Sequence, residues 1–452
     1  MTERLVVIGG DAAGMSAASQ ARRRRSRSEL EIVAYERSSY VSYAACGEPY
    51  HVAGYIDPLE RLVARTPEQF AEVGIEVHLR HEVVAIDLDD RTVTVHDLDR
   101  DRTFETPFDQ LLVATGAKAV RPPIEGIDLS GVYELRTLDD ARVLRRVADR
   151  EEGSVVVVGG GYIGLEVAEA FCVRGWEVTV LEAARSLLPR TFDADLGAEV
   201  AAALENMGIR TETGDPVVRI VGSDRVVAVE TETEKYPADA VVLGIGTRPE
   251  VALAAEAGIP LGPTGAIAVD DHQRTPVDGV WAAGDCAETR HVVTGAPVNL
   301  HLGTVANKTG RIAGINLTGG DVAFPGVLGT AITKVCDLEI ARTGLRESEA
   351  IEAGLDAVSA TVSGTTTAHY WPEAAEVTVR ATAERGTGRL LGAQIVGGPG
   401  AGKRIDVFAT ALWSRMTAEE LSWVDLAYAP PFSGVWDIIH IAARKAAQAA
   451  GG

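Results

Sequence analysis

The sequence lacks any uninterrupted apolar segment of the length needed to cross a bilayer, which is about 18 residues. The N-terminus also lacks the layout of a signal peptide, because the strand-like run Leu5 to Ile8 begins almost at once. We therefore expect no membrane partner and a cytoplasmic location.

Positive charge is also scarce. The chain has 43 Lys and Arg against 65 Asp and Glu, a net charge of -22. Such a chain repels polyanions overall, so nucleic acid is not an expected partner. Its one basic run, Arg22 to Arg25, is interpreted as a solvated helix end, with a specific anion site as the alternative.

Cysteine is rare, with four in 452 residues. They are Cys46, Cys172, Cys286 and Cys336, and no two are spaced as in a zinc site or a C-x-x-C pair. The sequence therefore predicts no metal site and no disulfide framework. The length predicts about three domains.

Two segments share one pattern: an apolar strand, a glycine turn and an amphipathic helix. They are 5–24, LVVIGGDAAGMSAASQARRR, and 155–174, VVVVGGGYIGLEVAEAFCVR. A second strand follows each and ends in an acid, Glu36 in the first copy and Glu182 in the second. This is the pattern of a dinucleotide-binding βαβ unit, present twice.

The residue types in both units suit a pyrophosphate. Glycines permit the tight turn and the close approach of phosphates, the helix N-terminus offers free N–H groups, and the acid accepts hydrogen bonds from a ribose. The second copy is complete, whereas the first has Asp11 where glycine is usual. Two units imply FAD and a nicotinamide cofactor. Glu182 favours NADH, because it repels a 2′-phosphate, and nearby Arg185 leaves NADPH open.

The last part of the chain has a different texture. From about Phe324, alternating segments such as 376–380 and 390–396 predict an antiparallel sheet. A last helix is expected over roughly Arg404 to Ser414, and prolines exclude a helix from Tyr428 to Ser433. The region is interpreted as a separate α+β domain.

Cys46 lies in the segment SYAACGEPY, whose small residues leave the sulfur accessible. A helix N-terminus or a nearby cation would make it a reactive thiolate. On local features alone it is equally a small buried hydrophobe. Packing roles are predicted for Cys172 within a helix, Cys286 after a turn, and Cys336, which is expected in a strand.

Further motifs resemble the pyridine nucleotide-disulfide oxidoreductase superfamily. They are the Gly159 turn, Ala114-Thr115-Gly116, Gly246-Thr247-Arg248-Pro249 and Ala283-Gly284-Asp285. Other segments are similar to its single-cysteine branch, which contains coenzyme A-disulfide reductases and NADH oxidases: 42–50, 306–308, 329–334, 402–406 and 428–431.

The resemblance implies an α/β fold with two Rossmann-like dinucleotide-binding domains and a C-terminal α+β dimerisation domain. The boundaries expected are 1–116 with 250–322 for the FAD domain, 117–249 for the NAD(P)H domain and 323–452 for the dimerisation domain.

The resemblance also implies site residues. Cys46 is the redox thiol. Two catalytic tyrosines, Tyr370 and Tyr428, come from the partner subunit of a homodimer. A purely structural role for Tyr428 in the proline loop is an equally weighted alternative. Contacts with coenzyme A are implied for Gln20, Arg23, Ser42, Lys403 and Arg404. Cofactor contacts, with Asp285 on the FAD ribityl chain, are implied for Gly9, Asp11, Ala12, Ala13, Gly14, Glu36, Thr115, Gly116, Gly159, Gly161, Tyr162, Ile163, Gly164, Glu182, Gly246, Asp285 and Ala306.

A second redox cysteine in a C-x4-C pair would lie five residues from Cys46, but those two positions hold Val41 and His51. An external thiol must therefore complete any disulfide cycle.

The leading hypothesis is an FAD-dependent NAD(P)H reductase of coenzyme A disulfide or a related persulfide. The alternatives are an NADH oxidase that reduces O2 to H2O2 or water through a Cys46 sulfenic acid, and a redox-sensing flavoprotein. Ala45 replaces an Asn common in coenzyme A-disulfide reductases, and Ala12 replaces the His of the oxidases, so each activity lacks one familiar side chain.

Overall fold

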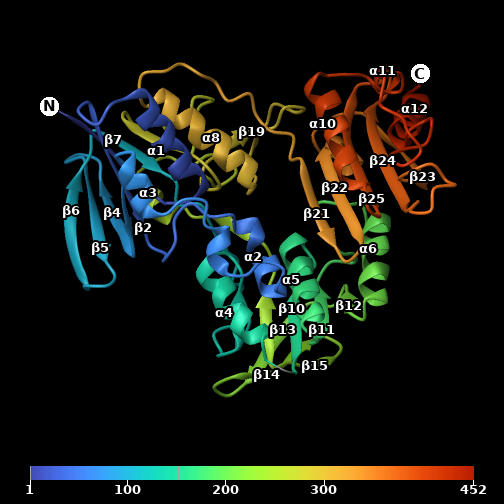
Figure 1. Cartoon of the computed structure of the whole chain (residues 1–452), viewed down its shortest axis with the longest axis horizontal. Helices are drawn as coiled ribbons and strands as arrows, with labels where there is room; N and C mark the ends of the chain where they lie inside the picture. Colours follow the sequence, from blue (N-terminus) through green and yellow to red (C-terminus); the bar gives the residue numbers. More distant parts are fainter. Residues whose placement is uncertain (1, 151, 452) are drawn as a thin grey trace.

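The computed structural model describes residues 2–150 and 152–451. Three five-stranded sheets, each with its own helices, form three lobes (Figure 1). None of the helices in these described ranges is long and apolar enough to cross a bilayer.

The first sheet is parallel, in the order β18-β7-β1-β2-β3. Its strands are β1 (Glu3–Ile8), β2 (Leu30–Glu36), β3 (Glu76–Leu79), β7 (Gln110–Val113) and β18 (Val280–Ala282). One face packs on α1 (Ala12–Arg24) and α8 (Gly303–Asn316). The other packs on an antiparallel sheet of β4 (His81–Asp87), β5 (Thr92–Asp97) and β6 (Arg102–Pro107). Both faces are covered, and so β1 is an unbroken apolar run from Leu5 to Ile8.

The second sheet repeats this plan, in the order β12-β11-β10-β16-β9. Its strands are β9 (Val132–Glu134), β10 (Ser154–Val158), β11 (Glu177–Glu182), β12 (Arg210–Thr213) and β16 (Ala240–Leu243). The helices are α4 (Leu138–Ala148), α5 (Tyr162–Val173) and α6 (Ala194–Asn206), and a small sheet of β13 (Val217–Gly222), β14 (Val226–Thr231) and β15 (Lys235–Pro237) lies beside them. The antiparallel pair β8 (Ala117–Ala119) and β17 (Thr247–Pro249) carries the chain into and out of this lobe.

A capping box starts α4. The Thr137 hydroxyl accepts the Asp140 N–H at 3.2 Å, and the Asp140 carboxylate accepts the Thr137 N–H at 2.9 Å.

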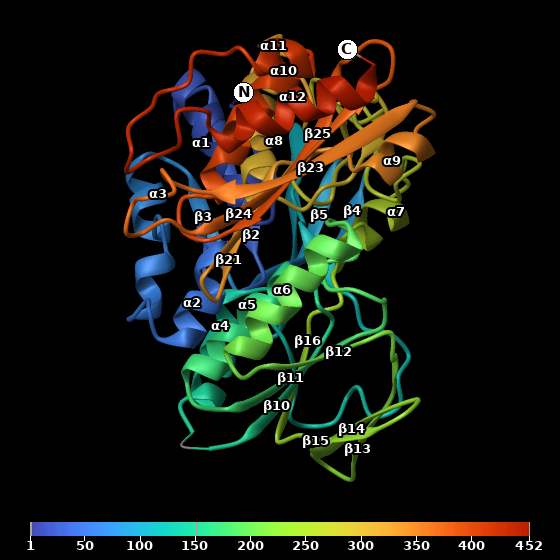
Figure 2. The same ribbon diagram turned by 90° about the vertical axis from the view of Figure 1, so that its right-hand side faces the viewer.

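The third sheet is antiparallel, in the order β21-β22-β25-β24-β23. It contains β21 (Ala331–Val335), β22 (Leu338–Gly344), β23 (Ala357–Thr365), β24 (Glu376–Glu384) and β25 (Leu390–Gly397). With it pack α9 (Glu347–Glu352), α10 (Ile405–Trp413), α11 (Ala418–Leu421) and α12 (Ile438–Ala450), seen together in Figure 2. The strands expected at 376–380 and 390–396 are therefore present.

Two local expectations for this region are wrong. The helix expected at Arg404–Ser414 is α10, but it is not the last, because α12 follows the proline segment and begins after Asp437, whose carboxylate caps it. Cys336 lies in the two-residue turn between β21 and β22, with φ of +55°, and not in a strand. The Glu169 carboxylate accepts the Cys336 N–H at 2.9 Å, which holds this turn without a glycine.

Short elements complete the described chain: η1 (Ala45–Gly47), α2 (Glu48–Ala53), η2 (Leu59–Leu62), α3 (Pro67–Glu72), α7 (Ala252–Glu256), β19 (Thr289–Arg290), β20 (Pro297–Val298) and η3 (Gly402–Arg404). Of these, α2 matters most for the site. It belongs to the N-terminal segment but packs on α4 and α5 of the second lobe. The Arg145 side chain of α4 donates to the His51 carbonyl at 2.8 Å and fixes α2 there.

Candidate active site

The β1–α1 turn accepts only glycine at its first position. Gly9 has a φ of +105°, and a Cβ there would lie 2.1 Å from the Ala114 carbonyl oxygen. The Glu36 carboxylate, at the end of β2, accepts the Gly10 N–H at 2.7 Å and the Ser38 N–H at 2.8 Å. Turn and acid therefore form one hydrogen-bonded unit at the carboxyl edge of the sheet, where dinucleotides bind in folds of this kind.

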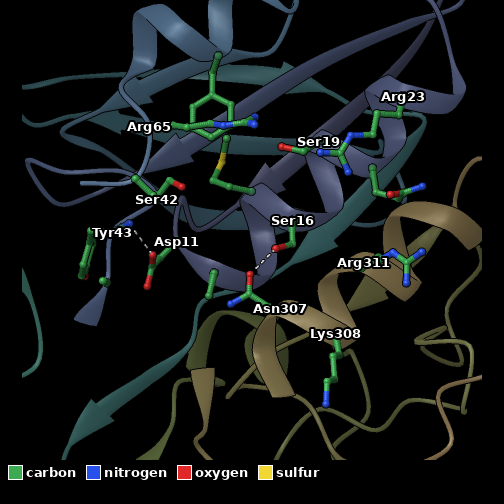
Figure 3. A pocket seen from close by; sticks show the side chains of 16 residues that line it. Asp11, Ser16, Ser19, Arg23, Ser42, Tyr43, Arg65, Asn307, Lys308 and Arg311 are labelled. Carbon is green, nitrogen blue, oxygen red and sulfur yellow. Dashed lines mark hydrogen bonds between the residues drawn. The ribbon is translucent and has the colours of Figure 1, made fainter. Parts of the chain in front are cut away.

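Asp11 stands at the N-terminus of α1 but does not cap it. Its carboxylate instead accepts the Tyr43 N–H at 3.1 Å (Figure 3). Burial raises the pKa of Asp11 to about 6, against the opposing effect of that hydrogen bond. The N–H groups of Ala13 and Gly14 in the first turn of α1 have no acceptor among the described residues and can meet an anion, which would further favour neutral Asp11.

The β10–α5 turn has the same construction. Gly159 has a φ of +107°, and a Cβ there would lie 2.5 Å from the Gly244 carbonyl oxygen. The Glu182 carboxylate accepts the Gly160 N–H and the Ala184 N–H, each at 2.8 Å. Gly161 precedes α5 without a capping side chain. The two predicted turns therefore have the same structure, one in the first sheet and one in the second.

Asp285 lies in the turn after β18 and pairs with Arg136 at 3.1 Å. The Arg136 Nε also donates to the Ala117 carbonyl of β8 at 3.0 Å. Arg136 therefore joins β8, which leads into the second lobe, to Asp285 of the first lobe. The neighbouring Thr115 hydroxyl donates to the Glu250 carbonyl at 2.6 Å and is already used within the chain.

The remaining predicted cofactor residues lie at these same places. Ala12, Ala13 and Gly14 start α1; Tyr162, Ile163 and Gly164 start α5; Gly116 and Gly246 flank the crossover strands; and Ala306 lies in α8. Ala13 and Ala306 both approach Gly284, where a Cβ would lie 2.8 Å and 3.6 Å from their own Cβ atoms. These small residues bring α1, α8 and the Asp285 turn together.

Cys46 lies in η1, immediately before α2, and its side chain is exposed. The pKa of its thiol is raised, first by loss of solvent around the sulfur and then by the negative charges of Glu166 and Glu48. Glu166 of α5 accepts a hydrogen bond from Thr333 of β21, and burial raises its pKa to about 7. The two lobes and the third sheet therefore all contribute to the surroundings of this sulfur.

The other cysteines are placed as packing residues. Cys286 is fully buried, whereas Cys172 and Cys336 are half-buried against the core of the second lobe.

A cavity of about 610 Å³ opens between α1, α8 and the segment that leads to Cys46 (Figure 3). The predicted residues Gln20, Arg23 and Ser42 meet in its wall. Ser16 donates to Asn307 at 2.8 Å and joins α1 to α8 at its base.

Sequence reasoning missed three further cations in this wall, Arg65, Lys308 and Arg311. Lys308 and Arg311 are three positions apart in α8 and therefore share a helix face, a signal that the sequence contained. Together with Arg23 they make four cations, and none has a carboxylate within ion-pair distance in the described part of the chain. In a chain with a net charge of -22, such a concentration of positive charge indicates an anionic ligand.

Lys403 and Arg404 do not line this cavity. Lys403 pairs with Asp406, and Arg404 pairs with Asp437 at 3.1 Å while donating to backbone carbonyls. Their charge is therefore already balanced within the third lobe.

Tyr370 and Tyr428 lie on the surface of that lobe, 63% and 47% exposed. A hydrogen bond between the two phenols raises the pKa of Tyr428. Within the described part of one chain, no hydrogen bond links either tyrosine to Cys46. The same surface exposes large apolar side chains: Trp423, Phe432, Val435 and Trp436.

Comparisons with known proteins identify the family of the chain. Residues 3–310 match the family model described as pyridine nucleotide-disulphide oxidoreductase, and residues 330–438 match its dimerisation domain. An NAD(P)H sulfur oxidoreductase (CoA-dependent) of Pyrococcus abyssi is 42% identical over 97% of both chains. An NADH oxidase of Methanocaldococcus jannaschii is 35% identical over 98% of both chains. The solved structure of an NAD-dependent persulfide reductase from A. fulgidus superposes with a TM-score of 0.93 at 38% identity, covering 98% of this chain and 82% of the other.

Proposed function

The chain belongs to the pyridine nucleotide-disulphide oxidoreductase family. From this premise we propose that it is an FAD-dependent NAD(P)H reductase of coenzyme A disulfide or coenzyme A persulfide. We propose that the reaction proceeds through Cys46. The observation that carries the proposal is the cavity with four cations that have no ion-pair partner among the described residues. Its wall includes residues 42–44, the last of which is two positions before Cys46. Coenzyme A combines a phosphorylated adenosine with a flexible arm that ends in sulfur. Its phosphates fit the cations, and its arm would lead the sulfur toward Cys46.

The two glycine turns fit the two dinucleotides that this reaction needs. Free N–H groups at α1 and the Arg136–Asp285 pair would hold the pyrophosphate and the ribityl chain of FAD, and Glu36 would meet its ribose. The turn at Gly159 with Glu182 would hold NADH. When bound, FAD supplies a route for an electron pair from the nicotinamide to sulfur.

Arg185 is exposed beside Glu182, which leaves NADPH as a second donor. The relatives named as NAD(P)H enzymes support this wider cofactor use.

Cys46 would act as the nucleophile. Its thiolate attacks one sulfur of coenzyme A disulfide, so that a Cys46–coenzyme A disulfide forms and one coenzyme A thiolate leaves with a proton from solvent or a nearby acid. Two electrons and one proton then cleave this mixed disulfide to coenzyme A thiol and the Cys46 thiolate. No second cysteine is required, in agreement with Val41 and His51 at the C-x4-C positions.

A homodimer would complete the site. The match of residues 330–438 to a dimerisation domain and the exposed Trp423, Phe432, Val435 and Trp436 support pairing through the third lobe. In this arrangement Tyr370 and Tyr428 of the partner subunit would approach Cys46, and a phenol can donate a proton to a leaving thiolate.

The test is intact-mass measurement of the unreduced protein together with turnover of Cys46→Ser. We expect a mass increment of one coenzyme A that NADH removes, and a Cys46→Ser variant that retains FAD but does not reduce coenzyme A disulfide. Retained turnover by Cys46→Ser would refute the mechanism.

The second candidate is an NADH oxidase, favoured by the relative of that name. It requires Cys46 to cycle through a sulfenic acid, and Ala12 at the start of α1 offers no side chain to stabilise that acid. Rapid oxygen uptake with NADH alone, and a Cys46 that carries one oxygen instead of coenzyme A, would favour the oxidase.

A further inference from the structure

The connecting segment, residues 187–193, joins the second lobe to the third. It leads into α6, which lies against β25 of the third lobe (Figure 1). Its apolar side chains are buried, and Leu187, Leu188 and Phe192 are at most 1% exposed. The backbone groups of a buried loop need hydrogen-bond partners within the protein. Here those partners come from two different lobes.

At its first end the connecting segment holds the glycine turn that we propose for NADH. The Leu188 N–H donates to the Gly160 carbonyl at 2.9 Å. The Leu187 side chain packs so closely that a Cβ on Gly160 would lie 2.5 Å from its Cδ2 atom. The Gly160 N–H donates to the Glu182 carboxylate at 2.8 Å. Gly160 is therefore fixed on one side by Glu182 and on the other by the connecting segment.

Two arginines of the third lobe, Arg342 and Arg346, donate to three carbonyls of the connecting segment. The acceptors are Thr191 at 3.2 Å from Arg342, and Pro189 and Phe192 at 3.1 and 3.0 Å from Arg346. Both guanidinium groups also pair with Glu349 of α9, at 2.8 and 3.3 Å. Because this acid holds the two cations in place, they can hold the segment in one position.

The last residue of the segment, Asp193, is held by the third sheet. Gln394 of β25, which is 2% exposed, accepts the Asp193 N–H at 2.9 Å and donates to the Asp193 carboxylate at 2.7 Å. Arg380 of β24 donates to the same carboxylate at 2.8 Å. Asp193 stands at the N-terminus of α6 but its side chain does not cap that helix. Its carboxylate is used instead to bind the segment to the third lobe.

Leu188 transmits these contacts to the glycine turn. Its φ is +53°, a left-handed conformation that a branched side chain adopts only where its surroundings hold it. Its carbonyl accepts the N–H groups of Thr191 and Phe192, each at 2.9 Å, and these are residues whose own carbonyls the arginines hold. Without the contacts from the third lobe, Leu188 would relax and withdraw its N–H from Gly160.

We propose that the connecting segment is a bracket through which the third lobe holds the Gly159 turn in its NADH-binding shape, and that Arg346 and Gln394 are positioning residues for NADH. The proposal rests on the proposed binding of NADH at this turn. It gives the lobe matched to a dimerisation domain a part in nucleotide binding, by contacts with the backbone of the second lobe.

Arg346→Met tests the bracket by removing two hydrogen bonds from the segment while it keeps the apolar stem of the side chain. Arg385→Met is the matched control, because Arg385 lies in the same lobe, is half exposed and pairs with Asp356 at 3.5 Å. The assay is calorimetric titration of the FAD-loaded enzyme with tetrahydro-NAD, a reduced nucleotide that cannot donate hydride. We expect its Kd to rise at least about fivefold in Arg346→Met and to stay unchanged in Arg385→Met.

Gln394→Glu tests the other end of the bracket. The new carboxylate still accepts the Asp193 N–H, but it also faces the Asp193 carboxylate, so two like charges meet. We expect the Kd for tetrahydro-NAD to rise at least about tenfold. Adding Asp193→Asn replaces one of these acids by a hydrogen-bond donor. The double variant should therefore return to within about threefold of the wild type, a rescue that a general loss of stability would not give.

Hydrogen–deuterium exchange provides a readout without any nucleotide. The peptide that contains the connecting segment should exchange at least about tenfold faster in Arg346→Met and in Gln394→Glu. Peptides of the first lobe, and the FAD content, should match the wild type.

Wild-type Kd values in both Arg346→Met and Gln394→Glu would overturn the proposal, as would equal rises in Arg346→Met and Arg385→Met. Gly159→Ala separates this proposal from the proposed NADH site. Wild-type affinity in Gly159→Ala would overturn both. Weakened binding there, with wild-type affinity in Arg346→Met and Gln394→Glu, would overturn the bracket alone.

Discussion

Replacing Gly159 by alanine isolates the role of the second glycine turn, because the same βαβ unit supplies a matched control. Gly159 and Gly175 both have a positive φ, +107° and +87°. A Cβ at Gly159 would lie 2.5 Å from the Gly244 carbonyl oxygen and 2.7 Å from its carbon, whereas a Cβ at Gly175 meets no atom within 4 Å. The two substitutions therefore share the backbone strain and differ in the collision.

The magnitudes follow from these contacts. A left-handed backbone costs an alanine about 1–2 kcal/mol, and this is the whole expected loss of unfolding free energy for Gly175→Ala. Gly159→Ala adds the cost of overpacking against rigid backbone, about 1–3 kcal/mol. We expect a total loss of about 2–5 kcal/mol for Gly159→Ala.

The displaced turn should also bind NADH poorly. We expect the Kd for NADH to rise at least about tenfold, equivalent to about 1.4 kcal/mol, in Gly159→Ala and to stay unchanged in Gly175→Ala. The FAD content of both should equal that of the wild type, because the Gly9 turn is untouched. Urea denaturation gives the stabilities, and calorimetric titration with NADH gives the Kd. Equal stability losses and equal Kd values for the two variants would refute the steric reasoning.

Three further outcomes are expected. Arg136→Met removes the cation 3.1 Å from Asp285, so the enzyme should lose FAD at least about tenfold more readily on dilution, measured by flavin fluorescence; full retention would place the pair outside the FAD site. Arg311→Gln should raise the KM for coenzyme A disulfide about fivefold with kcat unchanged, and reduce its dependence on salt; a lower kcat at constant KM would contradict a role in binding. Glu48 has a folded-state pKa of about 8 against an ordinary 4.5, so the folded FAD-free protein holds this proton more tightly than the unfolded chain and loses stability as pH rises through that window. Glu48→Gln should therefore gain stability relative to wild type between pH 5 and pH 9 in urea denaturation, and a constant difference would contradict the burial argument.

The local sequence was sufficient for the two nucleotide turns. Gly9 and Gly159 stand where only glycine fits, and Glu36 and Glu182 end the second strands as expected. The tertiary structure added that each carboxylate accepts the N–H of the second glycine, which ties the acid to its turn. That contact joins residues 22 or more positions apart, and spacing alone does not reveal it.

Two local predictions failed, and one set of site residues stays untested. Within one chain Lys403 and Arg404 lie outside the cavity and pair with Asp406 and Asp437, so their predicted contact with coenzyme A stays a prediction. The turn at Cys336 has no glycine to mark it, because a carboxylate from α5 holds it. The helix α12 lies beyond prolines that end local helical order, and it forms because its alanine-rich face packs on the third sheet.

By itself, the sequence determined the α/β class, the two nucleotide-binding units, the family resemblance that the comparisons confirm, and Cys46 as the candidate thiol. These features depend on periodicity and on residue types a few positions apart. Both are visible in the sequence before the fold is known. Only the tertiary structure decided that Arg23, Arg65, Lys308 and Arg311 gather in one cavity, and that Glu48, two residues after Cys46, is buried. Both depend on desolvation and on charges brought together from distant segments, and these arise only when α1 meets α8 and α2 packs on the second lobe.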